Sequence, residues 1–358
     1  MSAGFLYNWL MKHLILPVLL LMAPAAWSAP KKAQPAHVKK QAADVSKRKA
    51  PAAASAPMAL THSTPNFCIF GGQSGKALGG QAAFSSIVWR SDVVYIGETH
   101  DQPLDHQAQL EALKAMRIAR GQKIAVGFEM LDLTQQAALD DYAAGKLGEA
   151  DFLARTGWAD NWGFDFAMYR PVFEFVRQNK LRALALNVPR AVVAKIARGG
   201  LESLSADERK LLPETVALPH NARYNDYLKA SFGGHGEQTV QGMTLENYQA
   251  SMAAWNEGMG ARIADFLAAN PGYEVLVLAG NGHLMYNAGI QASVKSSAKD
   301  LRQASFYTED ARTCPDAIQA GHKDIANYVW YMNHPPKPKP AAPPAASTAP
   351  AAAAEQRK

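Results

Sequence analysis

The stretch SDVVYIGETHDQPLDHQAQLEALKAM (Ser91–Met116) decides the fold, because a strand, a polar turn and a helix follow one another in it. Val93–Gly97 is an apolar, β-branched run typical of a strand inside a sheet. Glu98 and His100 come directly after this run, and apolar residues three and four positions apart then predict a helix. The question is whether the carboxylate and the imidazole are a polar cap or a site for chemistry.

The same order of elements recurs along the chain. Helical patterns separate further apolar runs, which are Lys123–Met130, Leu181–Asn187, Tyr273–Gly282 and the weaker Gln303–Thr308. Strands that alternate with helices predict an α/β domain with a largely parallel central sheet flanked by helices. The less regular segment Gly199–Gly242 is expected to be an inserted helical lid.

Two local features carry narrower expectations. Thr134 stands where the helix after the second strand should begin, so we expect it to be the N-cap. The segment GGQSGKALGG (Gly71–Gly80) is rich in glycine, but it lacks the first glycine and the hydroxyl residue of a phosphate-binding loop. We therefore expect a flexible loop there.

The N-terminal segment has the features of an export signal. Lys12 and His13 precede an apolar run of about ten residues, which is short for a membrane span. Small residues on both sides of Trp27 favour cleavage after Ser28. We expect residues 1–28 to be a signal peptide and the mature protein to be periplasmic, without a lipid anchor, because no cysteine lies near the cleavage site.

Two segments rich in alanine, proline and lysine, 29–60 and 333–358, flank the predicted domain of residues 61–332. The formal charge of the whole chain is +6, yet the domain holds 25 basic and 29 acidic residues, a charge of −4. Nucleic-acid binding by the domain therefore has no electrostatic basis. The two segments are either solvated spacers or contacts for anionic components of the cell envelope.

The two cysteines, Cys68 and Cys314, lie near the two ends of this domain. In an oxidising compartment they are expected to form one disulfide that joins the entry of the domain to its exit. The alternative is a pair of free, buried thiols.

Polar residues follow four of the predicted strands. The first strand ends at Glu98 and His100, the second at Glu129 and the fourth just before His283, while Arg190 follows the third. Ligands of open α/β sheets bind at the carboxyl ends of the strands, so these side chains are expected to converge. Glu98, His100, Glu129 and His283 are called the rim below.

The rim residues are of the types that bind a divalent metal or move protons. Glu98, His100 and His283 are the candidate metal ligands, and Glu129 joins them as a candidate catalytic residue. For Glu98 the plainer alternative is a carboxylate that accepts amides at the start of the following helix.

Other side chains are candidates for contact with a ligand. His106, on the first turns of the next helix, either reaches the rim or is exposed, and Arg190 either pairs with a ligand carboxylate or forms an ordinary salt bridge. A tyrosinate is a known ligand of haem iron, and five tyrosines near the rim or the lid are candidates: Tyr169, Tyr224, Tyr227, Tyr248 and Tyr286. Tyr169 is the one most typical of a core position.

The order of these motifs resembles the ChaN-like haem-binding family of bacterial envelope proteins. The matching blocks cover nearly all of residues 90–292 and are YIGETHDQPLDHQ, VGFEM, the tryptophan and Y-R-P of Trp162–Pro171, ALNVPR, AAWNEGMGARI and LAGNGHLMYNAGI. The wider superfamily is similar to Tiki-type metalloproteases and erythromycin esterases. This chain departs from the family where paired histidines are usual, because it has Asp105 before His106, and it lacks the lipidation cysteine of many members.

The resemblance implies two kinds of site. In Tiki-type members, histidines and glutamates at the positions of His100, His283 and Glu98 are associated with metal-dependent peptide cleavage, and Glu129 is a plausible addition. In ChaN-like members it implies haem held by a tyrosine in a pocket made by two subunits, hence a homodimer. The residues expected to contact haem or a similar tetrapyrrole are His100, His106, Arg190, Tyr224, Tyr248, His283 and Tyr286.

The leading hypothesis is a periplasmic haem-binding protein with a role in haem or iron uptake. The alternative is a divalent-metal-dependent hydrolase of peptides or esters that uses the rim. A third possibility is an envelope scaffold whose proline-rich and lysine-rich ends bind partners.

Overall fold

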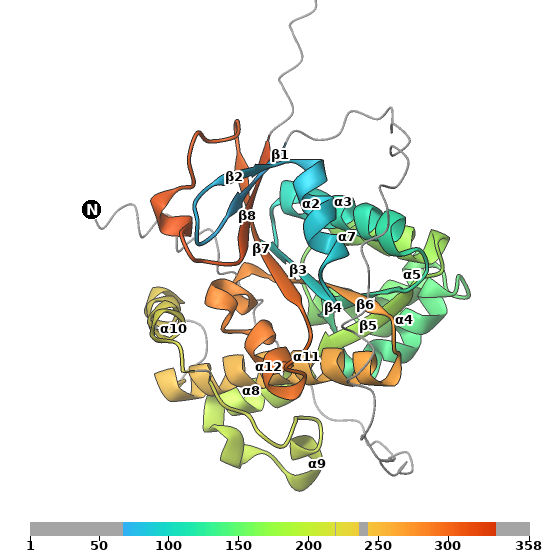
Figure 1. Cartoon of the computed structure of the whole chain (residues 1–358). Helices are drawn as coiled ribbons and strands as arrows, with labels where there is room; N and C mark the ends of the chain where they lie inside the picture. Colours follow the sequence, from blue (N-terminus) through green and yellow to red (C-terminus); the bar gives the residue numbers. More distant parts are fainter. Residues whose placement is uncertain (1–66, 219, 236–242, 334–358) are drawn as a thin grey trace, which may run out of the picture.

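The computed structural model describes residues 67–218, 220–235 and 243–333. They form an eight-stranded sheet in the order β2-β1-β8-β7-β3-β6-β4-β5, with helices on both faces (Figure 1). The strands are β1 (Phe67–Gly71), β2 (Ala77–Gly79), β3 (Val93–Glu98), β4 (Ile124–Asp132), β5 (Arg182–Asn187), β6 (Glu274–Gly280), β7 (Gln303–Ala311) and β8 (Tyr328–Asn333).

The sheet is largely parallel, as the alternation of strands and helices predicts. Neighbouring strands from β8 to β5 all pair in parallel. All five predicted strands are present at nearly the predicted positions. Three further strands, β1, β2 and β8, extend one side of the sheet, and β1 pairs antiparallel with both of its neighbours.

Alternation along the strands gives the sheet two apolar faces. In β3, Val94 and Ile96 point into one cluster, whereas Val93 and Tyr95 point into another. Successive side chains of a strand lie on opposite faces, so a run that is apolar at every position must be covered on both sides. The two faces carry different helices, and both are dry.

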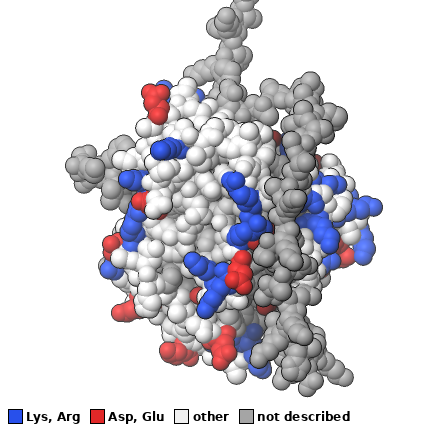
Figure 2. Space-filling view, viewed as in Figure 1, with Lys and Arg blue, Asp and Glu red and all other residues white. Residues whose placement is uncertain are grey.

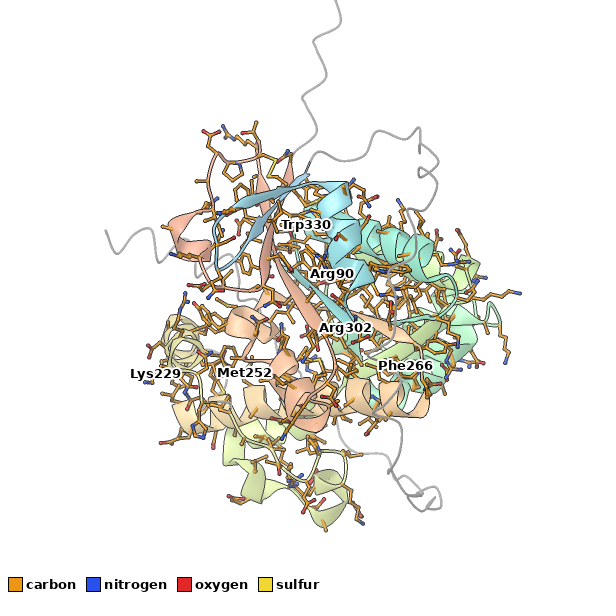
Figure 3. All side chains as sticks on the ribbon, in the orientation of Figure 1. Arg90, Lys229, Met252, Phe266, Arg302 and Trp330 are labelled. Carbon is orange, nitrogen blue, oxygen red and sulfur yellow. A yellow bond between two sulfur atoms is a disulfide. The ribbon has the colours of Figure 1, made fainter. Side chains whose placement is uncertain are left out.

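The larger cluster packs under the helices α2 (Gln81–Trp89), α3 (Pro103–Arg120), α4 (Gln136–Ala143), α5 (Glu149–Thr156), α6 (Trp158–Asn161) and α7 (Phe166–Gln178). Trp330 of β8, labelled in Figure 3, packs against Phe84 of α2 with ring centroids 4.8 Å apart. The opposite face is covered by α11 (Leu245–Ala269) and α12 (Ile290–Ser297), and α8 (Arg190–Gly199) packs on α11.

The expected lid holds a short 3-10 helix η3 (Leu201–Ser203) and two helices, α9 (Ala206–Arg209) and α10 (Ala222–His235). Helix α10 lies beside α11 near the carboxyl end of the sheet (Figure 1). Its two tyrosines and Tyr248 of α11 form an apolar cluster with residues of β7 and β8.

Two local expectations were wrong. Asp132, not Thr134, is the cap after the second strand: its carboxylate accepts from the Thr134 N–H at 2.8 Å, and the side chain of Gln135 reaches back to the Asp132 N–H. This capping box starts a 3-10 turn, η2 (Leu133–Gln135), before α4. The Gly71–Gly80 segment is not wholly a loop, because Ala77–Gly79 pairs with β1 as β2.

The predicted disulfide is present. Cys68 of β1 is bonded to Cys314, in the connection between β7 and β8, with a Cα–Cα distance of 5.9 Å. It therefore joins the first described strand to the loop before the last one. The predicted signal peptide and the two flanking segments lie outside the described residues, and no helix of the described chain is long and apolar enough to cross a bilayer.

Charged residues are mixed on the surface of the domain. On the face shown in Figure 2, Lys and Arg side chains are interspersed with Asp and Glu. This face carries no continuous basic stripe of the kind that tracks a nucleic-acid backbone.

Candidate functional site

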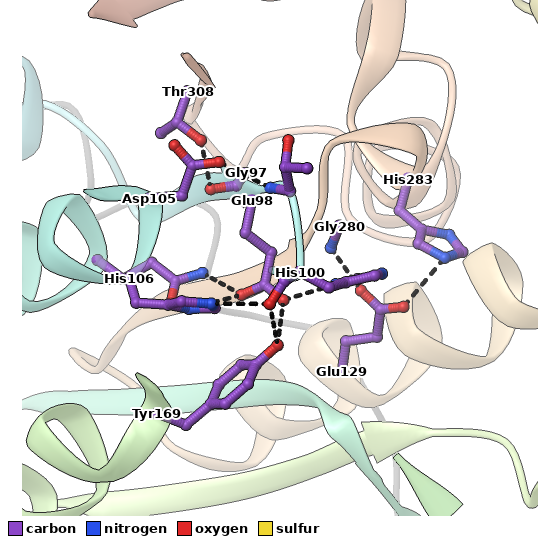
Figure 4. A network of polar contacts seen from close by, with 12 residues as sticks. Gly97, Glu98, His100, Asp105, His106, Glu129, Tyr169, Gly280, His283 and Thr308 are labelled. Atoms are coloured by element: carbon purple, nitrogen blue, oxygen red, sulfur yellow. Dashed lines mark hydrogen bonds and ion pairs between the residues drawn. The ribbon is translucent and has the colours of Figure 1, made fainter. Parts of the chain in front are cut away.

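The carboxyl ends of β3, β6 and β4 meet at one edge of the sheet (Figure 4). Glu98 lies opposite Gly280 in the β3–β6 pair, and β4 runs alongside β6 up to the residue before Glu129. His100 is two residues beyond the end of β3, and His283 lies in the 3-10 turn η5 (Asn281–His283) after β6. The prediction that the four rim side chains converge at one edge of the sheet is therefore confirmed. The two turns Gly97–His100 and Gly280–His283 are called the glycine–histidine turns below.

Glu98 is the most heavily bonded side chain of the rim. Its Oε1 accepts hydrogen bonds from His100 Nδ1 at 2.7 Å and from the Tyr169 hydroxyl at 2.8 Å. Its Oε2 accepts from Gln109 Nε2 at 2.6 Å and lies 3.5 Å from His106 Nδ1. Both oxygens of this buried carboxylate are thus occupied by protein donors.

These donors keep Glu98 ionised inside the protein. Burial by itself raises the pKa of Glu98, but the charges of His106 and His100 and the hydrogen bonds from His100 and Gln109 outweigh it, so the pKa lies below its usual value. The pKa of the neighbouring Tyr169 shifts the other way: burial, and then the charge of Glu98, raise it well above its ordinary value. The phenol therefore stays protonated and acts as a donor.

His100 uses one ring nitrogen within the rim and leaves the other without a protein partner among the described residues. The ring lies between Trp162 and Phe164, with centroids 4.7 and 4.9 Å away. Nδ1 is used by Glu98, the side chain is 21% exposed, and Nε2 has no hydrogen-bond partner among the described residues. Burial lowers the pKa of His100, but the bond to Glu98 and the charges of Glu98 and Glu129 outweigh it and raise the pKa.

Glu129 forms the second carboxylate–imidazole pair of the rim. Its Oε1 lies 3.2 Å from His283 Nε2, and its Oε2 accepts from the Gly280 N–H at 2.6 Å. Burial opposes ionisation here too, but the charge and hydrogen bond of His283, the charge of His100 and the Gly280 N–H together lower the pKa of Glu129 to about 2. The rim therefore holds two ionised, buried carboxylates, each paired with a histidine.

His283 is held from its other side by a residue of α11. Its Nδ1 lies 2.7 Å from Asn256 Oδ1, and the Asn256 amide donates to the Tyr224 hydroxyl at 2.9 Å. Tyr224 in turn donates to the carbonyl of Gly282 at 3.2 Å. This chain of hydrogen bonds links the rim to the lid helix α10.

The glycines of the two turns allow these contacts at close quarters. A Cβ atom on Gly97 would lie 2.0 Å from Asn281 Oδ1, and one on Gly280 would lie 2.8 Å from His100 Cε1. Neither position has room for a side chain, so glycine is required by packing at both. The Asn281 amide is itself bonded to the backbone of Thr308, which fixes the second turn to β7.

His106 reaches the rim and is not exposed. Its Nε2 lies 3.1 Å from the His100 carbonyl oxygen, and its ring contacts Tyr169 with centroids 4.2 Å apart. Asp105, beside it, is also buried and accepts from the Thr99 N–H at 2.7 Å. Burial, followed by the charges of Glu309 and Glu98, raises the pKa of Asp105 well above its usual range.

Arg190 is not at the rim. It is the first residue of α8 and donates to the backbone carbonyl of Asp160, so it is used between two helices. Three candidate tyrosines, Tyr224, Tyr227 and Tyr248, are buried between α10 and α11. Burial raises the pKa of each of them, to about 12 for Tyr227.

Tyr286 is different from these three. It lies in η6 (Met285–Asn287), three residues past His283, and is partly exposed. Its backbone has φ 59° and ψ 16°, the left-handed region that few residues other than glycine adopt. The Arg223 guanidinium lies 4.4 Å from the centre of its ring.

Sequence reasoning missed two partners of the rim, Gln109 and Asn256, and undervalued Tyr169. Tyr169 and Asn256 lie 71 and 27 residues from the side chains they contact, whereas Gln109 lies on the helix that directly follows Glu98. One signal was available for Asn256, which is a polar residue within the apolar helical block AAWNEGMG. It was not used, because a single amide does not by itself indicate a site.

The geometry does not support the expectation that Glu98, His100 and His283 bind a divalent metal. Within residues 67–218, 220–235 and 243–333, no three His, Cys, Asp or Glu side chains are grouped to hold a metal ion. The physical reason is that Glu98 and His283 direct their polar atoms at protein partners on two different sides of the rim. Of the proposed ligands, His100 has a ring nitrogen left for a guest.

Comparison with known proteins places the chain in a family. The model of the family described as "Haem-binding uptake, Tiki superfamily, ChaN" matches residues 87–294. Among solved structures, ChaN of Campylobacter jejuni, described as showing cofacial haem binding, superposes with a TM-score of 0.57 at 17% identity and covers 75% of this chain and 97% of its own. An erythromycin esterase mutant in its open conformation gives a TM-score of 0.40 at 12% identity, covering 68% and 77% of the two chains.

A relative from Arabidopsis thaliana, the chloroplastic protein RETICULATA-RELATED 5, is 20% identical over 261 residues. The match covers 67% of this chain but only 34% of that protein. The chain therefore spans about a third of the length of this relative. The family model spans both glycine–histidine turns, all four rim residues and the lid. The chain therefore belongs to the haem-binding uptake family of the Tiki superfamily that includes ChaN.

Proposed function

We propose that this protein binds haem after export to the periplasm and takes part in haem or iron uptake, with Tyr286 as the iron ligand. Membership of the haem-binding family supports the choice of ligand. The single observation that carries the choice of residue is that Tyr286, three residues past His283, is partly exposed.

Elimination among the five tyrosines supports the same residue. Tyr169 is committed as a donor to Glu98, and burial raises its pKa and those of the three tyrosines buried between α10 and α11. A tyrosinate ligand must lose its proton and meet the iron, and both requirements disfavour a fully buried phenol.

The backbone around Tyr286 supports a functional role. A left-handed conformation costs free energy for a tyrosine and persists only where surrounding contacts impose it. Here the Tyr286 N–H donates to the Ile325 carbonyl at 2.5 Å. Arg223, above the ring, donates to the Lys323 carbonyl at 3.0 Å and pairs with Asp324 at 3.8 Å. The conformation is thus held from the β7–β8 connection, and Arg223 adds a cation that suits a haem propionate.

A hemin titration tests the proposal. Purified protein is titrated with hemin, and we expect a saturable spectrum of the tyrosinate–ferric type at one haem per chain. Tyr286→Phe removes only the hydroxyl and should abolish that spectrum. Tyr273→Phe is the matched control, because Tyr273 is also partly exposed but precedes β6 at the opposite end of the sheet.

The outcomes separate the two parts of the proposal. Absence of any spectral change at stoichiometric hemin would refute haem binding by this chain. A tyrosinate spectrum that survives Tyr286→Phe would refute the ligand while leaving haem binding intact.

We also propose that haem binding joins two copies of the chain, as the cofacial arrangement described for the Campylobacter jejuni protein suggests. Sedimentation velocity with and without hemin tests this. The expected result is a shift to twice the monomer mass of the mature chain on adding hemin. A mass that stays monomeric at saturating hemin contradicts it.

Export is proposed from the N-terminal sequence. Expression of the whole chain in a bacterium should release, on osmotic shock, a protein whose N-terminus is Ala29. Retention of the intact N-terminus in the cytoplasmic fraction would contradict it.

Hydrolysis is the second candidate, and one observation favours it. Glu98 and His100 form a carboxylate–imidazole pair at 2.7 Å, and Nε2 of His100, whose side chain is 21% exposed, has no hydrogen-bond partner among the described residues. Such a pair suits a general base that takes a proton from water. The divalent metal of the original alternative is less well supported, because both Glu98 oxygens are already bonded.

Peptide and ester substrates with and without added zinc or a chelator test this candidate. We expect turnover to fall at least 100-fold in His100→Ala, since general base catalysis contributes about 10²–10⁴-fold. Turnover unchanged in His100→Ala, or none with any substrate, removes the hypothesis.

A further inference from the structure

Backbone strain in the described chain is concentrated around Tyr286. Three of its four non-glycine residues with a positive φ are Tyr286, Asn287 and Asp324. Asp324 directly precedes Ile325, whose carbonyl accepts the Tyr286 N–H. Asparagine and aspartate tolerate the left-handed region, but tyrosine adopts it rarely. The contacts that impose this conformation on Tyr286 therefore matter for its role.

Ser305 of β7 joins this turn to the sheet. Its hydroxyl donates to Asn287 Oδ1 at 2.5 Å. The serine oxygen also accepts from the Asn327 N–H at 3.0 Å, so its single proton is left for Asn287. The other acceptor within reach, Asn327 Oδ1, is more distant at 3.2 Å. Ser305 is completely buried, so water does not compete for its hydroxyl.

Asn327 fixes the position of Ser305 at a point where β8 has not yet begun. The Asn327 side chain takes the place of a neighbouring strand there, because its Oδ1 accepts from the Ser305 N–H at 3.1 Å. Two residues earlier, the Ile325 carbonyl holds the Tyr286 N–H. The turn is thus tied twice, once to β7 and once to the residues just before β8.

We propose that Ser305 is a positioning residue that holds Tyr286 in its left-handed conformation through Asn287, and that release of haem depends on this hold. Asn287 directly follows Tyr286, so freeing its side chain frees the backbone that aims the phenol. The inference rests on the proposed function in one respect, since Tyr286 is the proposed iron ligand. Its first half, the hold on the turn, requires no haem.

The role of Ser305 does not follow from membership of the family. The family model matches residues 87–294, and both Ser305 and Asn327 lie beyond them. The hold on Tyr286 therefore comes from a part of this chain that the family match does not cover.

Hydrogen exchange of the Tyr286 amide tests the hold in the absence of haem. The full chain is labelled with ¹⁵N-tyrosine, and the Tyr286 signal is the one missing from the spectrum of Tyr286→Phe. In Ser305→Ala this amide should exchange at least fivefold faster, about the ratio that one net hydrogen bond gives. Ser293→Ala is the matched control and should leave the rate unchanged, because it removes another buried serine hydroxyl, which donates to Glu257 Oε2 at 2.7 Å.

Transfer of hemin from the loaded protein to excess apomyoglobin tests the second half. Because the iron ligand moves with the turn, the tyrosinate spectrum should disappear at least fivefold faster in Ser305→Ala. The rate in Ser293→Ala should equal that of the wild type. A wild-type protein that binds no hemin refutes the proposed function and the second half with it, while the exchange rates still decide whether Ser305 holds the turn.

Two substitutions of Asn287 guard against a folding defect at the buried serine. Asn287→Gly leaves Ser305 and Asn327 in place and suits a positive φ, but it removes the acceptor, so it should reproduce the faster exchange. Asn287→Asp keeps an acceptor for the Ser305 hydroxyl and should exchange at the wild-type rate.

Three results overturn the proposal. One is exchange of the Tyr286 amide at the wild-type rate in Ser305→Ala or, where that variant does not fold, in Asn287→Gly. Another is equal acceleration in Asn287→Asp and Asn287→Gly, which would mean that the hydrogen bond is not the cause. The third is faster exchange with an unchanged rate of hemin transfer, because Ser305 would then hold the backbone without positioning the ligand.

Discussion

Replacing Glu129 by glutamine should remove a pH-dependent stabilisation that its pairing with His283 gives the fold. The pKa of Glu129 is lowered from 4.5 to about 2, in spite of burial, by His283, His100 and the Gly280 N–H. A depressed carboxyl pKa stabilises the folded state above the unfolded pKa, and the effect is lost as the pH falls toward the folded pKa. The window is therefore about pH 5 down to pH 2.

The magnitude follows from the size of the shift. A difference of about two and a half pKa units corresponds to about 3 kcal/mol of stabilisation at pH 7. At pH 3 somewhat over 1 kcal/mol of it is left, so about 2 kcal/mol is lost between pH 6 and pH 3. Glu129→Gln does not titrate, so the wild-type protein should lose about 2 kcal/mol more over this range than the variant does.

Urea unfolding at pH 6 and pH 3 measures the difference for both proteins. Glu208→Gln is the control: Glu208 also has a pKa lowered to about 2, by Lys195 and Ser205, but its side chain is 32% exposed. Solvent screening should reduce its pH-dependent contribution to a small part of that of Glu129. If the wild type and Glu129→Gln lose stability in parallel, Glu129 is not held ionised by its neighbours and the argument fails.

Three further predictions concern the same architecture. Gly280→Ala places a Cβ atom against the His100 ring, which packs against Trp162 and Phe164. The free energy of unfolding in urea should therefore fall by about 1–3 kcal/mol. An unfolding midpoint equal to that of the wild type would mean that the ring moves aside freely. Tyr169→Phe removes a hydrogen-bond donor to the buried Glu98 carboxylate. It should lower the free energy of unfolding at pH 7 by about 1.5–3 kcal/mol without changing the slope against denaturant. An unchanged free energy of unfolding would show that the bond is dispensable. Reducing the disulfide, whose cysteines are 246 residues apart, should lower the free energy of unfolding by about 2–5 kcal/mol, and identical urea curves with and without dithiothreitol would contradict it.

Much of the fold is encoded locally. Runs such as Val93–Gly97 are apolar at every position, which suits only a strand covered on both faces, and so the central parallel strands are visible in the sequence. The outer strands β1, β2 and β8 were not visible. They are short or lie at the ends of the domain, and the pairing of β1 with β8 joins segments more than 200 residues apart.

The rim was predictable for a similar reason. Parallel strands end at one edge of a sheet, so Glu98, His100, Glu129 and His283 had to converge once their strands were assigned. The sequence by itself therefore determined the central parallel strands and the convergence of these four side chains at their carboxyl ends.

Only the tertiary structure decided what those side chains do to one another. Tyr169 of α7 and Gln109 of α3 occupy the oxygens of Glu98, and Asn256 of α11 occupies a ring nitrogen of His283, all of which a metal would have used. No periodicity reveals these bonds, because they depend on how the helices pack against the end of the sheet. Burial likewise separated Tyr286 from the other tyrosines. Solvent exposure and the partners of a polar atom depend on how whole elements pack, whereas strand and helix periodicity depends on neighbouring residues alone.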